Sequence, residues 1–185
     1  PLVIIDTYGQ GLTQDYYTKA ASAFINVGLD GRTSVLDPVE HVGNSGLKIR
    51  GSSSAGYAKK QYAFELWNDV NGDDQAASLF GMPEESDWVL FGAYSDKTLM
   101  RNDLAYKWSN DIGQYAPRTE FCEAFIDTDG DGIITWSDYQ GVYSLMEKIK
   151  RDPERVDIEE ISRVDAAEPD VTGGYIIKRD RRDPG

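Results

Sequence analysis

The stretch LKIRGSSSAGYAKKQYAFEL, residues 47–66, contains two segments that alternate between apolar and polar residues. The first segment is Leu47–Arg50 and the second is Lys60–Leu66, and a loop rich in glycine and serine separates them. Alternation with a period of two is typical of a strand with one buried face, and small polar residues break the pattern between strands. The stretch therefore predicts two neighbouring strands.

Similar patterns elsewhere predict more strands and one long helix. The strands are expected at Leu2–Asp6, Ala20–Leu29, Thr119–Ile126, Val142–Ile149 and Gly174–Lys178. The long helix is expected from Asp96, a candidate N-cap, to Gly113, a natural C-terminal stop, with a shorter helix at Asp152–Ile161. Together these elements predict an α+β domain, with a mainly antiparallel sheet and one long helix packed among the strands.

Composition and charge exclude several classes of function. With 185 residues, of which 40% are hydrophobic, the chain is large enough for one domain with a real core, which we expect to span residues 1–185. A net charge of -13 repels nucleic acid and anionic membranes. Apolar runs fall far short of the roughly 20 residues that cross a bilayer, so no membrane span is expected.

The single cysteine and the single histidine limit the catalytic possibilities. Cys122 cannot form an internal disulfide and lies in an alternating run, which favours a packed thiol. His41 lies in a polar segment and would alone have to carry any Ser/His/Asp hypothesis, so a surface loop histidine is expected. A hydrolase with paired carboxylates remains an alternative because acids are abundant, although no pair stands out by its spacing.

Residues 127–138, DTDGDGIITWSD, match the twelve-residue calcium loop. Aspartates at positions one, three and five supply anionic oxygens from a tight turn, and the glycine at position six allows the sharp bend. The expected ligands are Asp127, Asp129, Asp131, the Ile133 carbonyl, Thr135 directly or through water, and Asp138. The aspartate at position twelve and the preceding strand make the loop similar to those of dockerin modules. The alternative is a solvated acidic turn.

Several phrases, in the same order and spacing, resemble the CotH (spore coat protein H) family of atypical protein kinases. They are LKIRGSSS (47–54), KKQY (59–62), ESDWVL (85–90), SDKTLMRN (95–102), YAPRT (115–119), YQGVY (139–143) and MEKI (146–149). The resemblance extends from Pro1 to about Arg179. The calcium loop stands where such domains have a brief turn, so we expect it to be inserted in a β-hairpin.

The resemblance implies an atypical protein-kinase N-lobe that helps to transfer phosphate from ATP, with Mg²⁺, to Ser or Thr hydroxyls of a protein substrate. The expected nucleotide-binding residues are Arg50, Ser52, Ser53, Lys59, Lys60, Arg101, Met146, Glu147 and Lys148. Lys60 is the expected phosphate-binding lysine and Lys59 competes with it, while Glu147 is the expected partner of the lysine. Solvated strand lysines and structural ion pairs are the alternatives. The catalytic residues are expected beyond Gly185, in a longer parent chain with further domains.

A second hypothesis from a different class is a noncatalytic, calcium-stabilised domain that keeps a kinase-like scaffold for binding. It would belong to a cell-surface or polysaccharide-degrading assembly. Under both hypotheses the calcium loop suits an extracellular or cell-surface location, because weak structural calcium sites need calcium-rich fluid. The sequence that follows in the parent chain would distinguish the two, since the noncatalytic domain would lack metal-binding aspartates there.

Overall fold

A computed structural model of the chain describes residues 1–68, 72–162, 164, 167–168, 171–172 and 174–177. The chain divides into two compact units, Pro1–Lys148 and Ile149–Gly185. In the described part of the second unit, residues 151 and 156 form an isolated bridge, and Arg151 forms an ion pair with Glu160 at 2.6 Å. No described helix is both long enough and apolar enough to cross a bilayer.

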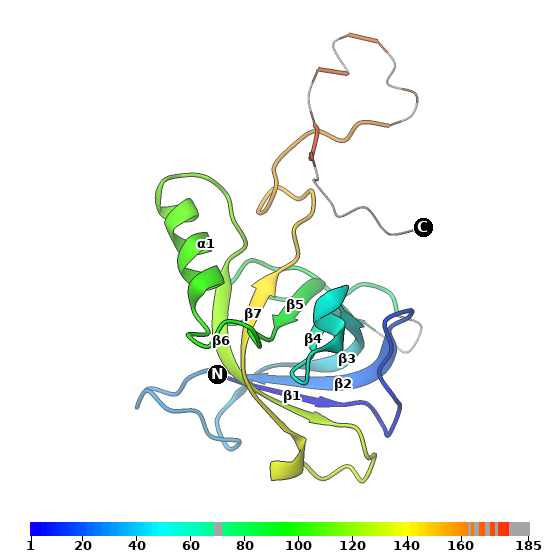
Figure 1. Cartoon of the computed structure of the whole chain (residues 1–185), viewed down its shortest axis with the longest axis vertical. Coiled ribbons are helices and arrows are strands. Elements are labelled where there is room, and N and C mark those ends of the chain that lie inside the picture. Colours follow the sequence, from blue (N-terminus) through cyan, green and yellow to red (C-terminus); the bar gives the residue numbers. More distant parts are fainter. Residues whose placement is uncertain (69–71, 163, 165–166, 169–170, 173, 178–185) are drawn as a thin grey trace. The chain divides into compact units, whose positions relative to one another are not determined.

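The first unit is a closed barrel of seven strands with the order β1-β2-β3-β4-β5-β7-β6 (Figure 1). The strands are β1 (Leu2–Asp6), β2 (Thr18–Ile25), β3 (Val39–Arg50), β4 (Gln61–Trp67), β5 (Asp87–Phe91), β6 (Thr119–Asp127) and β7 (Tyr139–Glu147). Neighbouring strands pair antiparallel except β1 and β6, which run parallel and close the barrel. Closure leaves neither of these strands with an unpaired edge.

Inward-facing side chains fill the barrel. Trp88, Phe24 and Phe64 are at most 1% exposed, and the rings of Phe24 and Phe64 meet edge to face with centroids 5.5 Å apart. Such a pair contributes about 0.5–1.5 kcal/mol beyond the burial of its area. The alternating burial of β4 matches the period-two pattern of its sequence, because successive side chains point to opposite faces of a strand.

The predicted α+β class is wrong, because the structure is a closed β-barrel and does not have the arrangement of an atypical kinase N-lobe. The expected long helix shortens to α1 (Arg101–Asp111), which lies beside the barrel (Figure 1). Two short 3-10 turns, η1 (Ser53–Gly56) and η2 (Trp136–Asp138), complete the helical elements in the described part of the first unit. The closure of the barrel was not predictable from the local sequence pattern, since β1 and its partner β6 are more than a hundred residues apart.

Helix α1 does not bury the apolar stripe that its spacing predicted. Leu104 and Trp108 are 37% and 63% exposed, whereas the buried residue of the helix is Asp103, which accepts a hydrogen bond from the Ser144 hydroxyl of β7 at 2.6 Å. The predicted N-cap Asp96 instead accepts hydrogen bonds from the backbone N–H groups of Thr98 and Arg101. It therefore shapes the turn that leads into the helix.

Most predicted strands are confirmed with shifted ends, and two predicted elements are not. β1 has the predicted bounds, while the segment 47–50 is the end of a much longer β3. Strand β5 had no predicted counterpart. No helix forms over residues 152–161, and the described residues 174–177 form no strand. Residues 173 and 178, at the edge of that predicted strand, lie outside the described residues.

Strand β1 offers a direct test of the barrel core. Ile5 is fully buried and Ile4, on the other face of the same strand, is only partly buried. Ile5→Ala is expected to lower the free energy of unfolding by about 2–5 kcal/mol, because it leaves a cavity in the core. Chemical denaturation measures this loss, with Ile4→Ala as the matched control. Equal losses in the two variants would contradict the inward orientation of Ile5.

Candidate functional site

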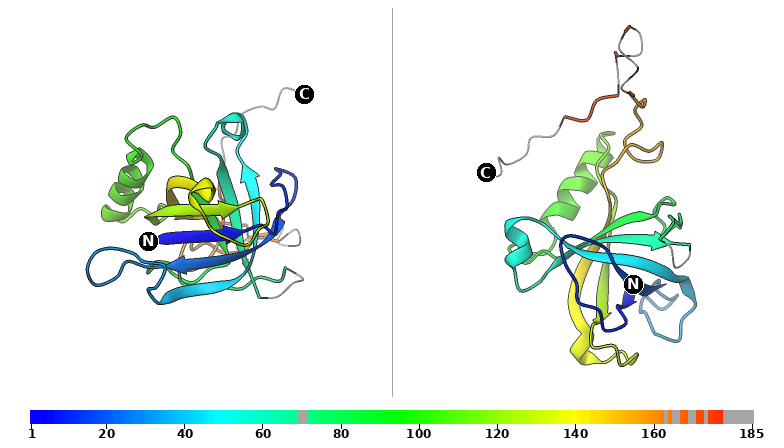
Figure 2. Two further views of the ribbon diagram at one scale, coloured as in Figure 1. Left: turned by 90° about the horizontal axis from the view of Figure 1, so that it is seen from below. Right: turned by 90° about the vertical axis from the view of Figure 1, so that its right-hand side faces the viewer.

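Three connections lie at one end of the barrel, which we call the mouth: residues 7–17, 51–60 and 128–138. The strand register places them together, because Asp6 pairs with Asp127, Thr18 with Leu47, and Arg50 with Gln61. These pairs lie at the strand ends from which the three connections leave. The mouth therefore includes the calcium-type loop and the loop of small residues, which lie apart on it with the connection 7–17 between them (Figure 2, right).

The loop 127–138 joins the antiparallel neighbours β6 and β7, as a hairpin connection does. Its aspartates fold the backbone around themselves: Asp127 Oδ1 accepts from the backbone N–H of Asp129 and of Gly130, both at 3.0 Å. The next two aspartates accept from the N–H two residues further along in the same way. Gly132 has a φ of 71°, which is a conformation that glycine adopts without strain.

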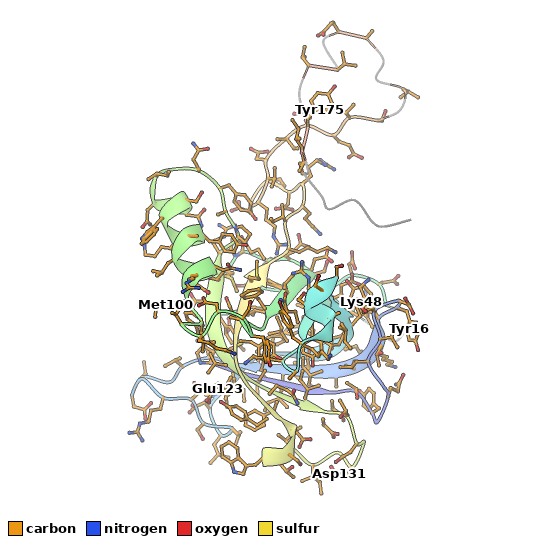
Figure 3. All side chains as sticks on the ribbon, viewed as in Figure 1. Tyr16, Lys48, Met100, Glu123, Asp131 and Tyr175 are labelled. Atoms are coloured by element: carbon orange, nitrogen blue, oxygen red, sulfur yellow. The ribbon has the colours of Figure 1, made fainter. Side chains whose placement is uncertain are left out.

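Three carboxylates converge in this loop. One oxygen atom from each of Asp127, Asp129 and Asp131 lies within 4.8 Å of the other two. Calcium binds oxygen at about 2.3–2.6 Å, so two ligands on opposite sides of the ion lie about 5 Å apart. The spacing of the three oxygens therefore fits a bound cation. Figure 3 labels Asp131 at the tip of this hairpin.

Asp127 is the most buried of the three converging carboxylates. The residue is 0% exposed, and its Oδ2 atom is buried without a hydrogen-bond partner. A buried carboxylate oxygen without a partner is costly. Hydrogen bonds from backbone N–H groups, first that of Gly130, lower the pKa of Asp127, so this carboxyl stays ionised at neutral pH. A cation would satisfy both the orphan oxygen and the charge.

The other three expected ligands play different parts in the structure. Asp138 is buried, and its Oδ2 accepts from both the backbone N–H and the hydroxyl of Thr135, so this pair forms a capping box for η2. Asp138 is not among the three carboxylates that converge. Ile133 is 63% exposed.

Cations gather at the same mouth. Lys59 Nζ donates to the Val142 carbonyl at 2.5 Å and lies 4.3 Å from the ring centroid of Tyr143, while Lys60 Nζ donates to the Ala55 carbonyl at 2.7 Å. Burial lowers the pKa of Lys59. Within the described part of the chain, no carboxylate forms an ion pair with either lysine. Both ammonium groups thus donate to backbone carbonyls, and no carboxylate of the described residues neutralises their charge.

The loop of small residues lies beside these lysines. Gly51 has a φ of 106°, a backbone conformation that strains residues with a Cβ and that glycine adopts readily. Ser52 and Ser53 are exposed, and so is Arg50 at the end of β3. Backbone amides and hydroxyls exposed in such a turn are suited to binding phosphate.

Glu147 lies at the opposite end of the barrel from Lys60. In the sheet register, Glu147 of β7 lies opposite Trp88 of β5, and Trp88 lies opposite Phe64 of β4. Phe64 is four residues beyond Lys60 along the chain. Four residues of strand span about 13 Å, at about 3.3 Å each. The expected ion pair between Lys60 and Glu147 does not form in the structure.

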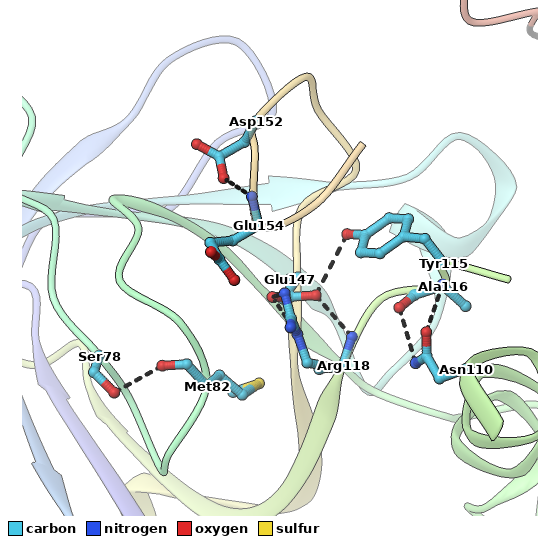
Figure 4. Close-up of polar contacts among 9 residues, drawn as sticks. All are labelled: Ser78, Met82, Asn110, Tyr115, Ala116, Arg118, Glu147, Asp152 and Glu154. Atoms are coloured by element: carbon cyan, nitrogen blue, oxygen red, sulfur yellow. Dashed lines mark hydrogen bonds and ion pairs between the residues drawn. The ribbon is translucent and has the colours of Figure 1, made fainter. Parts of the chain in front are cut away.

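Glu147 instead forms an ion pair with Arg118, whose side chain is 37% exposed (Figure 4). Its two carboxylate oxygens accept from the Arg118 side chain at 2.8 and 2.9 Å and from the Arg118 backbone N–H at 2.9 Å. The Tyr115 hydroxyl donates to it at 3.3 Å. Glu147 is 0% exposed, so this cluster joins the segment before β6 to the end of β7.

The remaining candidates are also held by structural contacts. Lys148 forms an ion pair with Asp87 at 2.6 Å, and Met146 is buried in β7. Arg101 is highly exposed at the start of α1 and lies 3.6 Å from Asp96. The structure thus brings Arg50, Ser52, Ser53, Lys59 and Lys60 to the mouth, and leaves Arg101, Met146, Glu147 and Lys148 outside it.

The structure shows where the single cysteine, Cys122, and the single histidine, His41, lie. Cys122 is buried, as expected of a packed thiol, and burial raises its pKa to about 12, which leaves it unreactive at neutral pH. His41 lies on β3, and not in a loop as predicted. Burial lowers the pKa of His41, so it is mostly neutral at pH 7.

Comparison with known proteins identifies one family. Residues 47–184 match the family described as CotH kinase protein, whereas the resemblance was expected to begin at Pro1. The match therefore begins within β3 and includes the residues 51–60 and 128–138 of the mouth. None of the curated proteins matches the chain.

The ion pair between Arg118 and Glu147 predicts a specific stability effect. Arg118→Met is expected to lower the free energy of unfolding by about 3 kcal/mol, because it removes the Arg118 charge that lies against a fully buried carboxylate. Lys107→Met, which removes an exposed pair with Asp111, is the matched control and is expected to cost less than about 0.5 kcal/mol. Urea denaturation measures both, and similar losses would contradict a structural role for the pair of Arg118 and Glu147.

Proposed function

Because the chain belongs to the CotH kinase family, we propose that its barrel mouth binds the phosphates of ATP for a protein kinase reaction. The observation that supports this most directly is the grouping of unpaired cations. Lys59 and Lys60 lie beside the Gly51–Ser54 loop and have no carboxylate partner among the described residues. In phosphoryl transfer the protein contributes mainly positioned charges and metals, so such a grouping is what the reaction needs.

The substrate class follows from the family. We propose that the γ-phosphate of ATP, bound with Mg²⁺, is transferred to Ser or Thr hydroxyls of a protein substrate. The residues that carry the magnesium and the catalytic base are proposed to lie in a longer parent chain. Arg50 and the hydroxyls of Ser52 and Ser53 would contact phosphate oxygens beside the two lysines.

We also propose that residues 127–138 bind Ca²⁺ as a structural ion. Support comes from the three converging carboxylates and from the orphan Oδ2 of the buried Asp127. Oxygen ligands in a flexible loop favour calcium over magnesium, which needs a stricter octahedral geometry. The loop would then work at the calcium concentrations of an extracellular or cell-surface location.

A noncatalytic role remains the second candidate, and one observation favours it. Glu147, the expected partner of the phosphate-binding lysine, is engaged by Arg118 at the other end of the barrel. The ion pair typical of active protein kinases is thus not assembled by these residues. In the noncatalytic case the calcium-stabilised barrel would serve as a binding module.

Calcium binding predicts a thermal shift. Calcium at a hundredfold excess over its Kd should stabilise the folded chain by about 2.7 kcal/mol, because the ion binds the folded form alone. Differential scanning calorimetry in calcium and in chelator measures the rise in Tm. Asp129→Asn should abolish the rise, whereas Asp111→Asn, an exposed acid on α1, should keep it. An unchanged Tm in the unmutated chain, with calcium and with chelator, would exclude the calcium site.

Nucleotide binding predicts a loss on removing the mouth lysines. Lys60→Met is expected to weaken binding of a fluorescent ATP analogue with Mg²⁺ by about tenfold or more, since a hydrogen bond to a charged group contributes about 1.5–3 kcal/mol. Lys59→Met tests the competing lysine, and Lys107→Met on α1 is the control. Fluorescence titration measures the affinities at constant calcium. If neither mouth lysine matters, the noncatalytic role is favoured.

A further inference from the structure

We propose that calcium in the loop 127–138 orders the Gly51–Ser54 loop, through the segment Thr7–Gln14 that lies between them. This inference rests on the proposed calcium site and adds regulation to it. Calcium would then raise the affinity of the mouth for phosphate, although the ion itself never touches the nucleotide.

The segment is anchored first to Asp127, the residue that begins the metal loop. The backbone N–H and the hydroxyl of Thr7 both donate to the Asp127 carbonyl at 3.0 Å. Thr7 is 0% exposed. Any shift of Asp127 on binding an ion therefore reaches the β1–β2 connection through two buried hydrogen bonds.

A second anchor lies three residues into the metal loop. Gly9 and Gly130 pack backbone against backbone, so closely that a Cβ built on Gly130 would lie 2.8 Å from the Gly9 Cα. Both glycines have positive φ, 72° and 78°. The contact leaves no room for either loop to move toward the other, so such a movement of the metal loop would push on the segment Thr7–Gln14.

The other end of the segment is attached to the end of β3 and to the Gly51–Ser54 loop that follows it. Ile49 N–H donates to the Thr13 carbonyl, and the Gln14 side chain donates through Nε2 to the Gly51 carbonyl, both at 2.7 Å. The Thr18 hydroxyl donates to the Gly11 carbonyl and holds the middle of the segment. Figure 3 labels Tyr16 in this connection and Lys48 near the end of β3.

The Gly51 carbonyl is the atom through which the segment Thr7–Gln14 would restrain the Gly51–Ser54 loop. Gly51 has the conformation that only glycine adopts easily, and it precedes Ser52 and Ser53, whose side chains are exposed. Within the turn, the Ala55 N–H donates to the Ser52 carbonyl, and Lys60 Nζ donates to the Ala55 carbonyl. The Gln14 hydrogen bond adds a restraint from outside the turn, and an exposed turn of this kind responds to small changes in such restraints. Ordering the turn before the nucleotide arrives removes part of the entropy cost of binding.

Hydrogen exchange on this chain, with calcium alone or with chelator, tests the inference. Calcium should slow exchange in residues 127–138 and, by about fivefold or more, in residues 51–57, as expected for a coupling near the low end of the usual range. In Gln14→Ala the slowing at 127–138 should persist, while that at 51–57 should fall below about twofold. Gln10→Ala, in the same segment, is the matched control and should show the same slowing as the unmutated chain.

The outcomes separate the two proposals. Protection at 127–138 without any change at 51–57 would overturn the coupling and leave the calcium site intact. No protection anywhere on adding calcium would instead refute the calcium site. Retained coupling in Gln14→Ala would also overturn the pathway, because the hydrogen bond to Gly51 is its last link.

Discussion

The parallel pairing of β1 with β6 is the interaction on which the rest of the structure depends. It closes the sheet into a barrel and brings the residue after β1, Thr7, onto the carbonyl of the last residue of β6, Asp127. Parallel neighbours need a long crossover, and here nearly the whole barrel intervenes between them. The same contact that closes the core therefore also positions the first carboxylate of the metal loop.

Charge is arranged in opposite ways at the two ends of this barrel. At one end Glu147 is buried and fully satisfied by Arg118, so its charge serves the fold. At the mouth the carboxylates of residues 127–131 face one another, and the lysines at 59 and 60 donate only to backbone carbonyls. Unbalanced charge of both signs at one end is costly for stability and is typical of sites that bind ions or charged ligands.

The chain matches a kinase family, but its described part does not have the fold expected of a kinase N-lobe. The chain belongs to the CotH kinase family, yet the described part of its first unit is a barrel with one helix beside it. Helix α1 contacts β7 through a buried hydrogen bond between Asp103 and Ser144, and its Leu104 and Trp108 are 37% and 63% exposed. A helix held in this way contributes little to the core. The barrel alone therefore carries the geometry of the mouth.

Local signals in the sequence predicted most of the strands, although they missed β5 and placed a strand at 174–178, of which the described residues 174–177 form no strand. The alternation at residues 60–66 predicted β4 closely, and the spacing of Asp127, Asp129 and Asp131 predicted that their carboxylates converge, because both patterns act within a few residues. Closure of the barrel, the pairing of Glu147 with Arg118 and the anchoring of Gly9 on Gly130 were decided only by the tertiary structure. These contacts join residues that are tens to more than a hundred positions apart, and no short-range pattern records which distant strand will become a neighbour.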